Sequence, residues 1–528
     1  MEISYNPVNG GNDRYQTIVC RTAVTDELSG EYVLPDYIGD VKRILHTFVR
    51  PRYSECTAES DGIRIRGESV FSVLMLTEEG KVASNVFSLE YTHLCECAAA
   101  DGDISAMCYP VCENATARLL SPRKIALKAR MRTAVSAVGT SPCAPEYSGT
   151  HTAADEAELE CRTDTVDTLC LCRAQKSDLH FSEDMVLDGA ESVIGEILYI
   201  GAEVSLPECR TAGGNLSVSG ETTVFALCTD PAGKLFCTQR RFPISATQKC
   251  DWKDGMNLWA WGTADGVKAS VVPNSYGENK VIELDVTWSY CAEGECNLPM
   301  QIARDAYSTR YVCENTYAPL NLYAGRKCER AHITVNESRP RGEVGGESAE
   351  KVLFTSVRMQ PAAIVTDENG CMLCTANAEV AMLVTDGEES PSVLRFTVPV
   401  KYEGDAMPQG SVCDVRMEAE GVRGRLDSGA VYCDFEAVLC ITSMEKLSQT
   451  ALREVHFDRD NPLPPDDRPP ITLYYPQEGE SVWDIARRYH TTQDSILHAN
   501  RLTSDCIHTE KVLMIPSQNK NGVYSGVI

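Results

Sequence analysis

The chain has 528 residues, 43% of them hydrophobic and 7% aromatic, and a formal net charge of −27 from 76 acidic and 49 basic side chains. This length allows three or four domains, and the apolar content supports folded cores. A surface this acidic is repelled by the phosphate backbone of nucleic acids. We therefore expect no nucleic-acid partner.

The first residues, Met1 to Pro7, lack the basic and apolar regions of a signal peptide. No apolar run reaches the roughly 20 residues that a membrane-spanning helix needs. We therefore expect a cytosolic protein without a transmembrane segment.

The 24 cysteines fit a cytosolic protein best as reduced thiols. Several, such as Cys228, Cys433 and Cys440, stand within predicted strands, where a thiol acts as a small apolar side chain. Three close pairs leave zinc binding or later oxidative cross-linking as alternatives. They are Cys95 with Cys97, Cys170 with Cys172, and Cys371 with Cys374.

A strand pair recurs on a long period. Residues 63–81 and 216–234 share a Gly-Glu step, an alternating strand, an acidic or proline-containing turn and a Gly-Lys step, and residues 374–387 repeat the pattern more weakly. Alternation with β-branched residues predicts half-buried strands, and the Glu, Asp and Gly clusters predict hairpin turns. The chain is therefore expected to be mainly β.

The repeats predict three tandem antiparallel domains of the β-sandwich or barrel-like type. Their expected bounds are residues 15–150, 160–298 and 299–456. A segment rich in Ser, Gly, Thr and Ala, roughly residues 139–156, predicts a linker between the first two.

Three features of these repeats resemble SPOCS domains, which occur in spore-forming Firmicutes. They are the segment from Leu34 to Leu45, the Gly-Glu strand pairs, and residues 121–125, Ser-Pro-Arg-Lys-Ile. The resemblance covers most of the chain up to about residue 456 and implies SPOCS-type β domains.

Residues 458–470 are rich in proline, which removes backbone donors and fixes φ, so a semi-rigid spacer of up to roughly 40 Å is expected here. Residues 471–517 then predict a βααβ module. Ser481 with Asp484 is typical of a capping box, and Thr492 of a second N-cap. A flexible tail is expected over residues 518–528.

The module resembles the LysM domain. Residues at the family's positions include Gly479, Ser481, Trp483, Ile485, Tyr489, Asn500, Leu513, Ile515 and Pro516. The resemblance implies a shallow groove between two loops that binds N-acetylglucosamine polymers. The expected groove or partner-binding residues are Gly479, Glu480, Ser481, Val482, Trp483, Thr503, Ser504, Asp505, Cys506 and Ile507.

Pro476 and Glu510 depart from the LysM pattern, which puts sugar binding in question. SPOCS-type domains followed by a LysM domain resemble the clostridial spore-coat morphogenetic proteins. That resemblance implies a mother-cell protein at the forespore surface, whose LysM domain contacts a SpoIVA-like coat ATPase and whose other partners are coat proteins. Peptidoglycan binding in the cortex or cell wall is the alternative.

The sequence contains no phosphate-binding loop, nucleophile elbow or His-Glu-x-x-His motif. We therefore expect no enzymatic activity, no catalytic residues, no metal site and no cofactor. Trp252, Trp259 and Trp261 form an aromatic group that favours core or cross-strand packing, with a partner-binding face as the alternative. Trp483 is interpreted as a structural anchor of the module in preference to a sugar platform.

Overall fold

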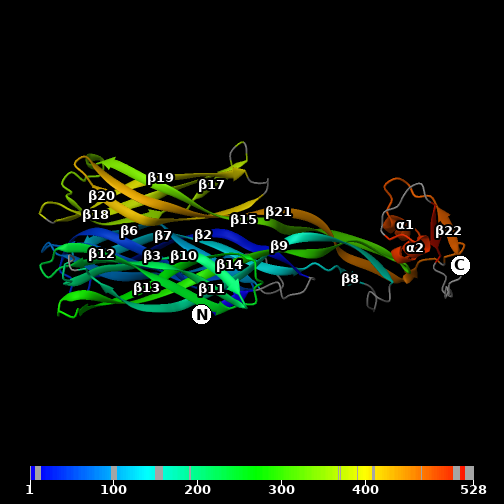
Figure 1. Ribbon diagram of the computed structural model, residues 1–528, viewed down its shortest axis with the longest axis horizontal. Coiled ribbons are helices and arrows are strands. Elements are labelled where there is room, and N and C mark those ends of the chain that lie inside the picture. The colour runs from blue at the N-terminus through cyan, green and yellow to red at the C-terminus, as the bar shows by residue number, and fades with distance from the viewer. Residues whose placement is uncertain are drawn as a thin grey trace.

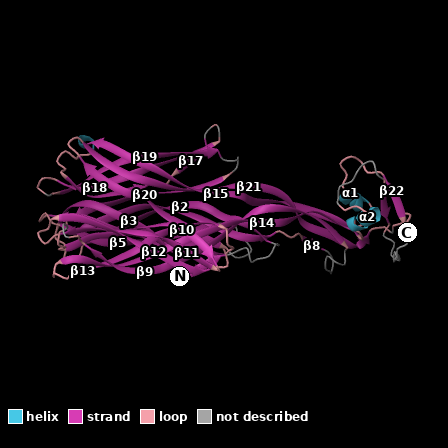
Figure 2. Cartoon of the chain, in the orientation of Figure 1, coloured by secondary structure: helices cyan, strands magenta, loops and turns pink. Residues whose placement is uncertain are grey.

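The computed structural model describes residues 2–5, 14–96, 104–148, 158–188, 192–366, 368, 370–388, 390–406, 411–464, 466–503 and 512–517. The described chain is mainly β, with two short α-helices near the C-terminus, as predicted. It is elongated: a broad β body narrows to a stalk, and a small module lies at the far end of that stalk (Figure 1, Figure 2).

The first repeat forms two three-stranded antiparallel sheets that share one core. Phe71, Val73 and Met75 of one sheet pack against Ile125, Leu127 and Met131 of the other. One sheet has the order β2–β7–β6 and the other β3–β4–β5. Their bounds are β2 (Arg14–Val33), β3 (Val41–Glu59), β4 (Gly62–Thr77), β5 (Val82–Glu96), β6 (Ser105–Ser121) and β7 (Lys124–Pro142).

The second repeat has the same plan, with the orders β1–β9–β14–β13 and β10–β11–β12. Its core includes Leu216 and Val218 of one sheet and Trp288 and Tyr290 of the other. The bounds are β1 (Glu2–Tyr5), β9 (Leu159–Val186), β10 (Glu196–Ala212), β11 (Asn215–Thr229), β12 (Leu235–Lys249), β13 (Asn257–Pro273) and β14 (Asn279–Ser308).

In the third repeat, β15–β21–β20 faces a sheet in which β18 pairs with β16, β17 and β19. A short strand, β8 (Glu146–Ser148), pairs in parallel with β21. The remaining bounds are β15 (Tyr311–Pro340), a 3-10 turn (Arg341–Glu343), β16 (Lys351–Met359), β17 (Ala363–Thr366), β18 (Cys371–Thr385), β19 (Pro391–Ala406), β20 (Val412–Leu426) and β21 (Ala430–Pro462).

The hairpin turns expected at the repeated motif are present in the structure. The Thr77 N–H donates to the Lys81 carbonyl, the Asp230 N–H to that of Lys234, and the Asp386 N–H to that of Ser390. Gly80 and Gly233 occupy the left-handed region at φ +81° and +87°. Only glycine adopts this conformation without steric cost, which explains why both turns carry it.

The three repeats, called units from here on, follow one another in sequence and pack against one another in space. Leu74, Leu227 and Leu383 come from the corresponding strand of each unit and are buried in one shared cluster. Phe48 of the first unit stacks on Tyr199 of the second with ring centroids 3.7 Å apart, and Phe354 of the third meets them edge-on. The body is thus one packed assembly of three units.

Four long strands continue past the body and form the stalk (Figure 1). They are β9, β14, β15 and β21, with 28, 30, 30 and 33 residues. A strand of this length reaches about 100 Å at ~3.3 Å per residue. Met300 and Ile302 of β14 and Leu322 of β15 are buried together in one hydrophobic cluster of the stalk. The expected boundary between residues 298 and 299 therefore falls inside β14.

The proline-rich segment differs from the expected spacer. Residues 458–462 continue β21, and Pro462 pairs opposite Tyr311 at the end of the ladder. Proline is tolerated there because a strand end needs no further N–H bond. Arg468 then donates to the Tyr489 carbonyl at 2.7 Å, so the segment packs on the module. The expected flexible tail, residues 518–528, lies outside the described residues.

Among the described residues, we found no helix that combines the length and the apolar character needed to cross a membrane.

Candidate functional site

The terminal module has the predicted βααβ order. It consists of β22 (Ile471–Tyr474), α1 (Val482–Arg488), α2 (Gln493–Asn500) and β23 (Leu513–Pro516). The Asp484 N–H donates to Ser481 Oγ at 3.2 Å, and the Ser481 N–H donates to Asp484 Oδ2 at 3.0 Å. The predicted capping box is therefore confirmed. The Ser495 N–H donates to Thr492 Oγ1, which confirms the second cap.

The core of the module includes a residue of the stalk. Val482, Trp483, Ile485 and Ile515 are buried together with Tyr307 of β14. The Tyr307 ring lies edge-on to Trp483 with centroids 4.9 Å apart, and its hydroxyl donates to the Thr491 carbonyl at 2.8 Å. The module is thus packed on the stalk, and its hydrophobic core continues into β14.

Asp305, two residues before Tyr307, fixes the module by polar contacts. Its Oδ2 accepts from Trp483 Nε1 at 3.0 Å and from Arg487 Nη1 at 2.5 Å. Its Oδ1 accepts from Asn315 Nδ2 at 2.9 Å. Hydrogen bonds between charged groups are stronger than neutral ones, so this carboxylate joins stalk and module firmly. Neither Asp305 nor Tyr307 was anticipated, because nothing in the sequence indicates which stalk residue meets the module.

The predicted groove residues occupy two different environments. Val482 and Trp483 are buried in the core, so their side chains do not line a surface groove. Gly479, Ser481 and Thr503 lie on or near the surface of the loops. Glu480 is half-buried in the same loop, and the other four residues, Ser504, Asp505, Cys506 and Ile507, lie outside the described residues.

Glu480 holds the loop after β22 in shape. Its carboxylate accepts from the Tyr474 hydroxyl at 2.8 Å, from the Gln477 N–H at 2.8 Å and from Arg488 at 2.7 Å. Desolvation opposes ionisation, but these donors together lower the pKa of Glu480. Gly479 beside it has φ +86°, a left-handed turn position. The predicted loop is therefore ordered by Glu480, whose charge is already matched by Arg488.

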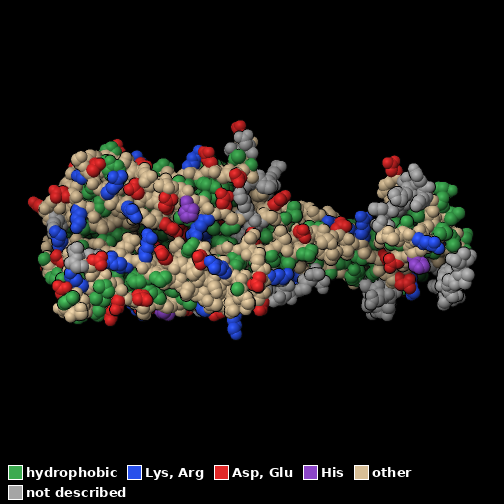
Figure 3. All heavy atoms as spheres, viewed as in Figure 1, with side chains coloured by type: hydrophobic (Ala, Val, Ile, Leu, Met, Phe, Trp, Pro, Cys, Tyr) green, Lys and Arg blue, Asp and Glu red, His purple; other side chains and the backbone are tan. Residues whose placement is uncertain are grey.

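The outer face of the β22–β23 sheet is apolar and exposed. Ile471 and Leu473 of β22, and Tyr475 directly after that strand, stand at alternate positions with 50%, 66% and 72% of their surface accessible. Leu473 pairs with Met514 of β23, and Val512 precedes that strand. Hydrophobic side chains gather at this end of the molecule in Figure 3. The signal was present in the sequence, as apolar residues at alternate positions whose intervening residues face the core.

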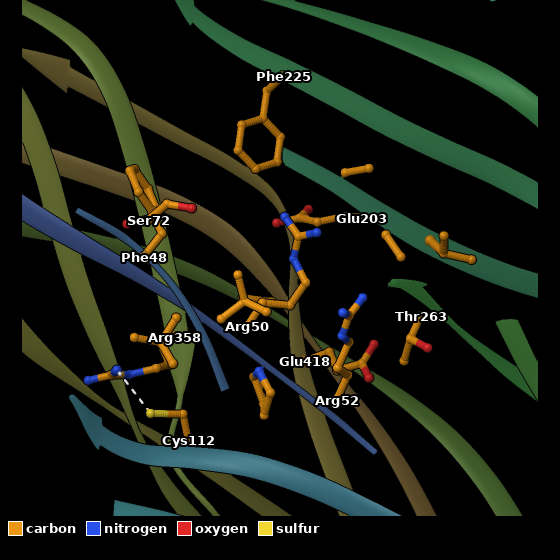
Figure 4. A pocket seen from close by; sticks show the side chains of 18 of the residues that line it. Phe48, Arg50, Arg52, Ser72, Cys112, Glu203, Phe225, Thr263, Arg358 and Glu418 are labelled. Atoms are coloured by element: carbon orange, nitrogen blue, oxygen red, sulfur yellow. Dashed lines mark hydrogen bonds between the residues drawn. The ribbon is translucent and has the colours of Figure 1, made fainter. Parts of the chain in front are cut away.

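A chamber lies between the three units of the body. This chamber has a volume of about 1970 Å³. Most of its lining comes from the edge strands β3 and β6, β10 and β13, and β16 and β20, and the rest comes from neighbouring strands of the same sheets. Figure 4 shows Arg50, Glu203, Arg358 and Glu418 in its wall. Arg358 Nη1 contacts Cys112 Sγ at 3.7 Å, and the Tyr109 hydroxyl donates to Glu418 at 2.8 Å. These contacts link different units, which gives the lining a role in assembly of the body.

The tryptophans of the second unit, Trp252, Trp259 and Trp261, make packing contacts within the chain. Trp252 is buried, and Trp259 stacks on Trp261 with centroids 4.6 Å apart. Arg416 of the third unit lies over Trp261 at 3.8 Å. The partner of this aromatic pair is therefore the third unit of the same chain. Within the described residues, no group of three or more His, Cys, Asp or Glu side chains is placed to hold a metal ion.

Comparison with protein families identifies the terminal module. Residues 477–516 match the LysM domain, which agrees with the βααβ order and the two caps. The match supports carbohydrate or peptidoglycan binding by this module. No curated protein and no solved structure matched the chain.

Proposed function

We propose that the chain is a non-enzymatic assembly protein that presents a LysM module at the end of a rigid stalk to a protein partner. The observation that carries this proposal is the exposed apolar face of β22–β23, made of Ile471, Leu473, Tyr475, Val512 and Met514. Contiguous apolar patches on soluble proteins mark interaction sites, because leaving them in water costs free energy.

The position of this face supports docking to a large partner. The module lies at the stalk tip, away from the body (Figure 3), in a chain of net charge −27. Repulsion between exposed charges fades beyond about 8–10 Å in physiological salt, so a partner at the tip escapes most of the field of the body. Trp483, Arg487 and Tyr307 are engaged inward, which holds the apolar face outward.

The sequence resemblance supplies the identity of the partner in this proposal. SPOCS-like repeats followed by a LysM domain resemble SipL, a clostridial spore-coat morphogenetic protein. The proposed partner is accordingly a SpoIVA-like coat ATPase at the forespore surface. The proposed location is the mother-cell cytoplasm, and the three β units contact other coat proteins.

A face variant tests the proposal. Full-length protein carrying Leu473→Glu places a charge at the centre of the apolar face without touching the module core. We expect it to lose capture of the coat ATPase in a pulldown from sporulating cells, and a fluorescent fusion to disperse from the forespore surface. The matched loop variant Glu478→Lys, also exposed, should bind normally. Undiminished capture by Leu473→Glu would sink the proposal.

Peptidoglycan binding is the second candidate, favoured by the LysM match itself. It would use the loop from Gly479 to Ser481 and the region of Thr503, leaving the apolar face free. Full-length protein should then sediment with purified peptidoglycan, and Thr503→Arg should reduce the sedimented fraction while Leu473→Glu does not. Absence of binding at millimolar chitooligosaccharide would remove this candidate.

A further inference from the structure

Two cysteines stand directly opposite each other where the stalk leaves the body. Cys170 of β9 pairs with Cys296 of β14 in the antiparallel ladder. Among the strand pairs of the described residues, this is the one position at which cysteine faces cysteine. Directly opposed residues have Cα atoms about 4.5–5.5 Å apart, a separation that a disulfide spans.

The two side chains are on the same face of the ribbon and in contact. The Cys170 thiol is hydrogen-bonded to Cys296 and to Cys172, which lies two residues along the same strand. Cys170 and Cys172 are buried, whereas Cys296 is half-buried. A reagent from solvent therefore reaches the pair through Cys296.

The location of the pair gives it mechanical importance. Cys172 belongs to the core of the second unit, together with Trp252 and Tyr290, and Cys296 packs against that core. Met300 and Val166, a few residues further along the same two strands, belong to the stalk core. A covalent link between Cys170 and Cys296 would therefore join the two strands at the point where the stalk is rooted in the body.

We propose that Cys170 and Cys296 form a disulfide when the protein meets a low-molecular-weight disulfide oxidant, and that this bond fastens the base of the stalk. The Cys296 thiolate attacks the oxidant, forming a mixed disulfide and releasing one thiol. The Cys170 thiolate then attacks the Cys296 sulfur and releases the second thiol. Two protein thiols become one disulfide, and one oxidant disulfide becomes two thiols.

The surroundings make the reaction slow at neutral pH. Hydrogen bonding to Cys172, with burial, raises the pKa of Cys170 to about 12. Hydrogen bonding to Cys170, followed by burial, also raises the pKa of Cys296. Because the thiolate is the reacting form, the rate should increase as the pH rises. The pair thus stays reduced in a reducing compartment and closes on prolonged exposure to oxidant.

The test uses full-length protein incubated with oxidised glutathione at pH 8.5, then alkylated and digested without reduction. We expect a linked peptide containing Cys170 and Cys296, and a higher melting temperature that reverts with reductant, since the bond closes a long loop. Cys296→Ser should lose both effects, whereas Cys313→Ser, a half-buried stalk thiol, should keep them.

Cys172→Ser separates this proposal from the alternative in which Cys172 forms the disulfide. If Cys170 bonds to Cys296, the linked peptide persists in Cys172→Ser. A link through Cys172, or alkylation of both Cys170 and Cys296 after complete glutathione treatment, would overturn the proposal. The melting temperature of each reduced variant checks that the variant folds, so failure to link is not mistaken for failure to fold.

Discussion

At the residue scale, Asp305 is the point at which stalk and module are joined. Its carboxylate accepts from Trp483, Arg487, Asn315 and the Tyr317 hydroxyl, and only 16% of its side chain is exposed. Removing it would leave the indole N–H of Trp483 buried without an acceptor. An unsatisfied buried donor costs about 1–3 kcal/mol.

Asp305→Ala should therefore loosen the module while leaving the body intact. We expect faster amide hydrogen exchange in α1 and earlier proteolytic release of the module, with the body melting as before. Glu314→Ala, an exposed carboxylate on the neighbouring β15, serves as the control and should change neither. Unchanged exchange in α1 would show that Tyr307 alone holds the module.

Glu203 gives the body a pH-dependent stability. Burial within the protein, followed by the nearby carboxylates of Glu418 and Glu420, raises its pKa to about 7. The folded state therefore keeps a proton that the unfolded chain releases near pH 4.5, so this contribution is full below pH 4.5 and is lost as the pH rises to about 7. The Glu203 side chain lines the chamber and is exposed there, so solvent screening moderates the effect.

Glu203→Gln should remove this part of the pH dependence. The variant is expected to melt at a higher temperature than the wild type at pH 8, and the difference should shrink towards pH 5. Thermal unfolding between pH 5 and 8 measures it. Glu221→Gln, an exposed carboxylate in the same chamber wall, is the control. Parallel curves for Glu203→Gln and wild type would contradict the assignment.

At the element scale, arginines from one unit cap the strand edges of another. Arg21 of the first unit donates to the Cys413 carbonyl of the third. Arg173 of the second donates to the carbonyl of Ser105 on the edge strand β6 of the first, and also to that of Ser136 on the central strand β7. Arg395 of the third donates to the Leu45 carbonyl of the first. Edge strands carry unpaired carbonyls that invite aggregation, and these contacts close them within one chain.

Arg173 should be the most sensitive of these contacts. It forms a buried ion pair with Glu293 at 2.9 Å, with side chains 4% and 7% exposed. Truncating one partner leaves the other charge unpaired, which costs about 3–5 kcal/mol. Arg173→Met should destabilise the body by that amount in denaturant unfolding, and adding Glu293→Leu should recover part of it. A double variant less stable than Arg173→Met would contradict this account.

At the scale of the whole molecule, the stalk makes the module a dependent part of the fold. The module core includes Tyr307, and the linker packs back through Arg468. The body has its own cores in each unit. The body should therefore keep its stability without the module, whereas the module should lose stability without the stalk.

A truncation pair checks this asymmetry. Residues 1–470 should unfold at nearly the temperature of the full chain. The module alone, residues 463–528, should be less stable than in the full chain because it lacks Asp305 and Tyr307. Tyr307→Ala in the full chain should lower the stability of the module in the same way, by about 3–5 kcal/mol for a large buried aromatic. Hydrogen exchange in α2 compares the full chain, the isolated module and Tyr307→Ala, and equal protection in all of them would contradict the prediction.

The sequence by itself determined the local structure. Alternating β-branched residues and glycine turns predicted the strands of the repeats, because hydrophobic alternation and positive φ are local requirements. Ser481 with Asp484, and Thr492, predicted the helix starts of the module for the same reason. The family of the module followed from spacing that residues 477–516 carry on their own.

Only the tertiary structure decided how these parts meet. Leu74, Leu227 and Leu383 read as ordinary core residues of separate units, and their shared burial depends on contacts between positions far apart in the chain. The continuous strand through residue 298, the insertion of Tyr307 into the module and the opposition of Cys170 to Cys296 depend on long-range register. A hydrophobic pattern specifies that a side chain is buried, but it does not specify which distant surface buries it.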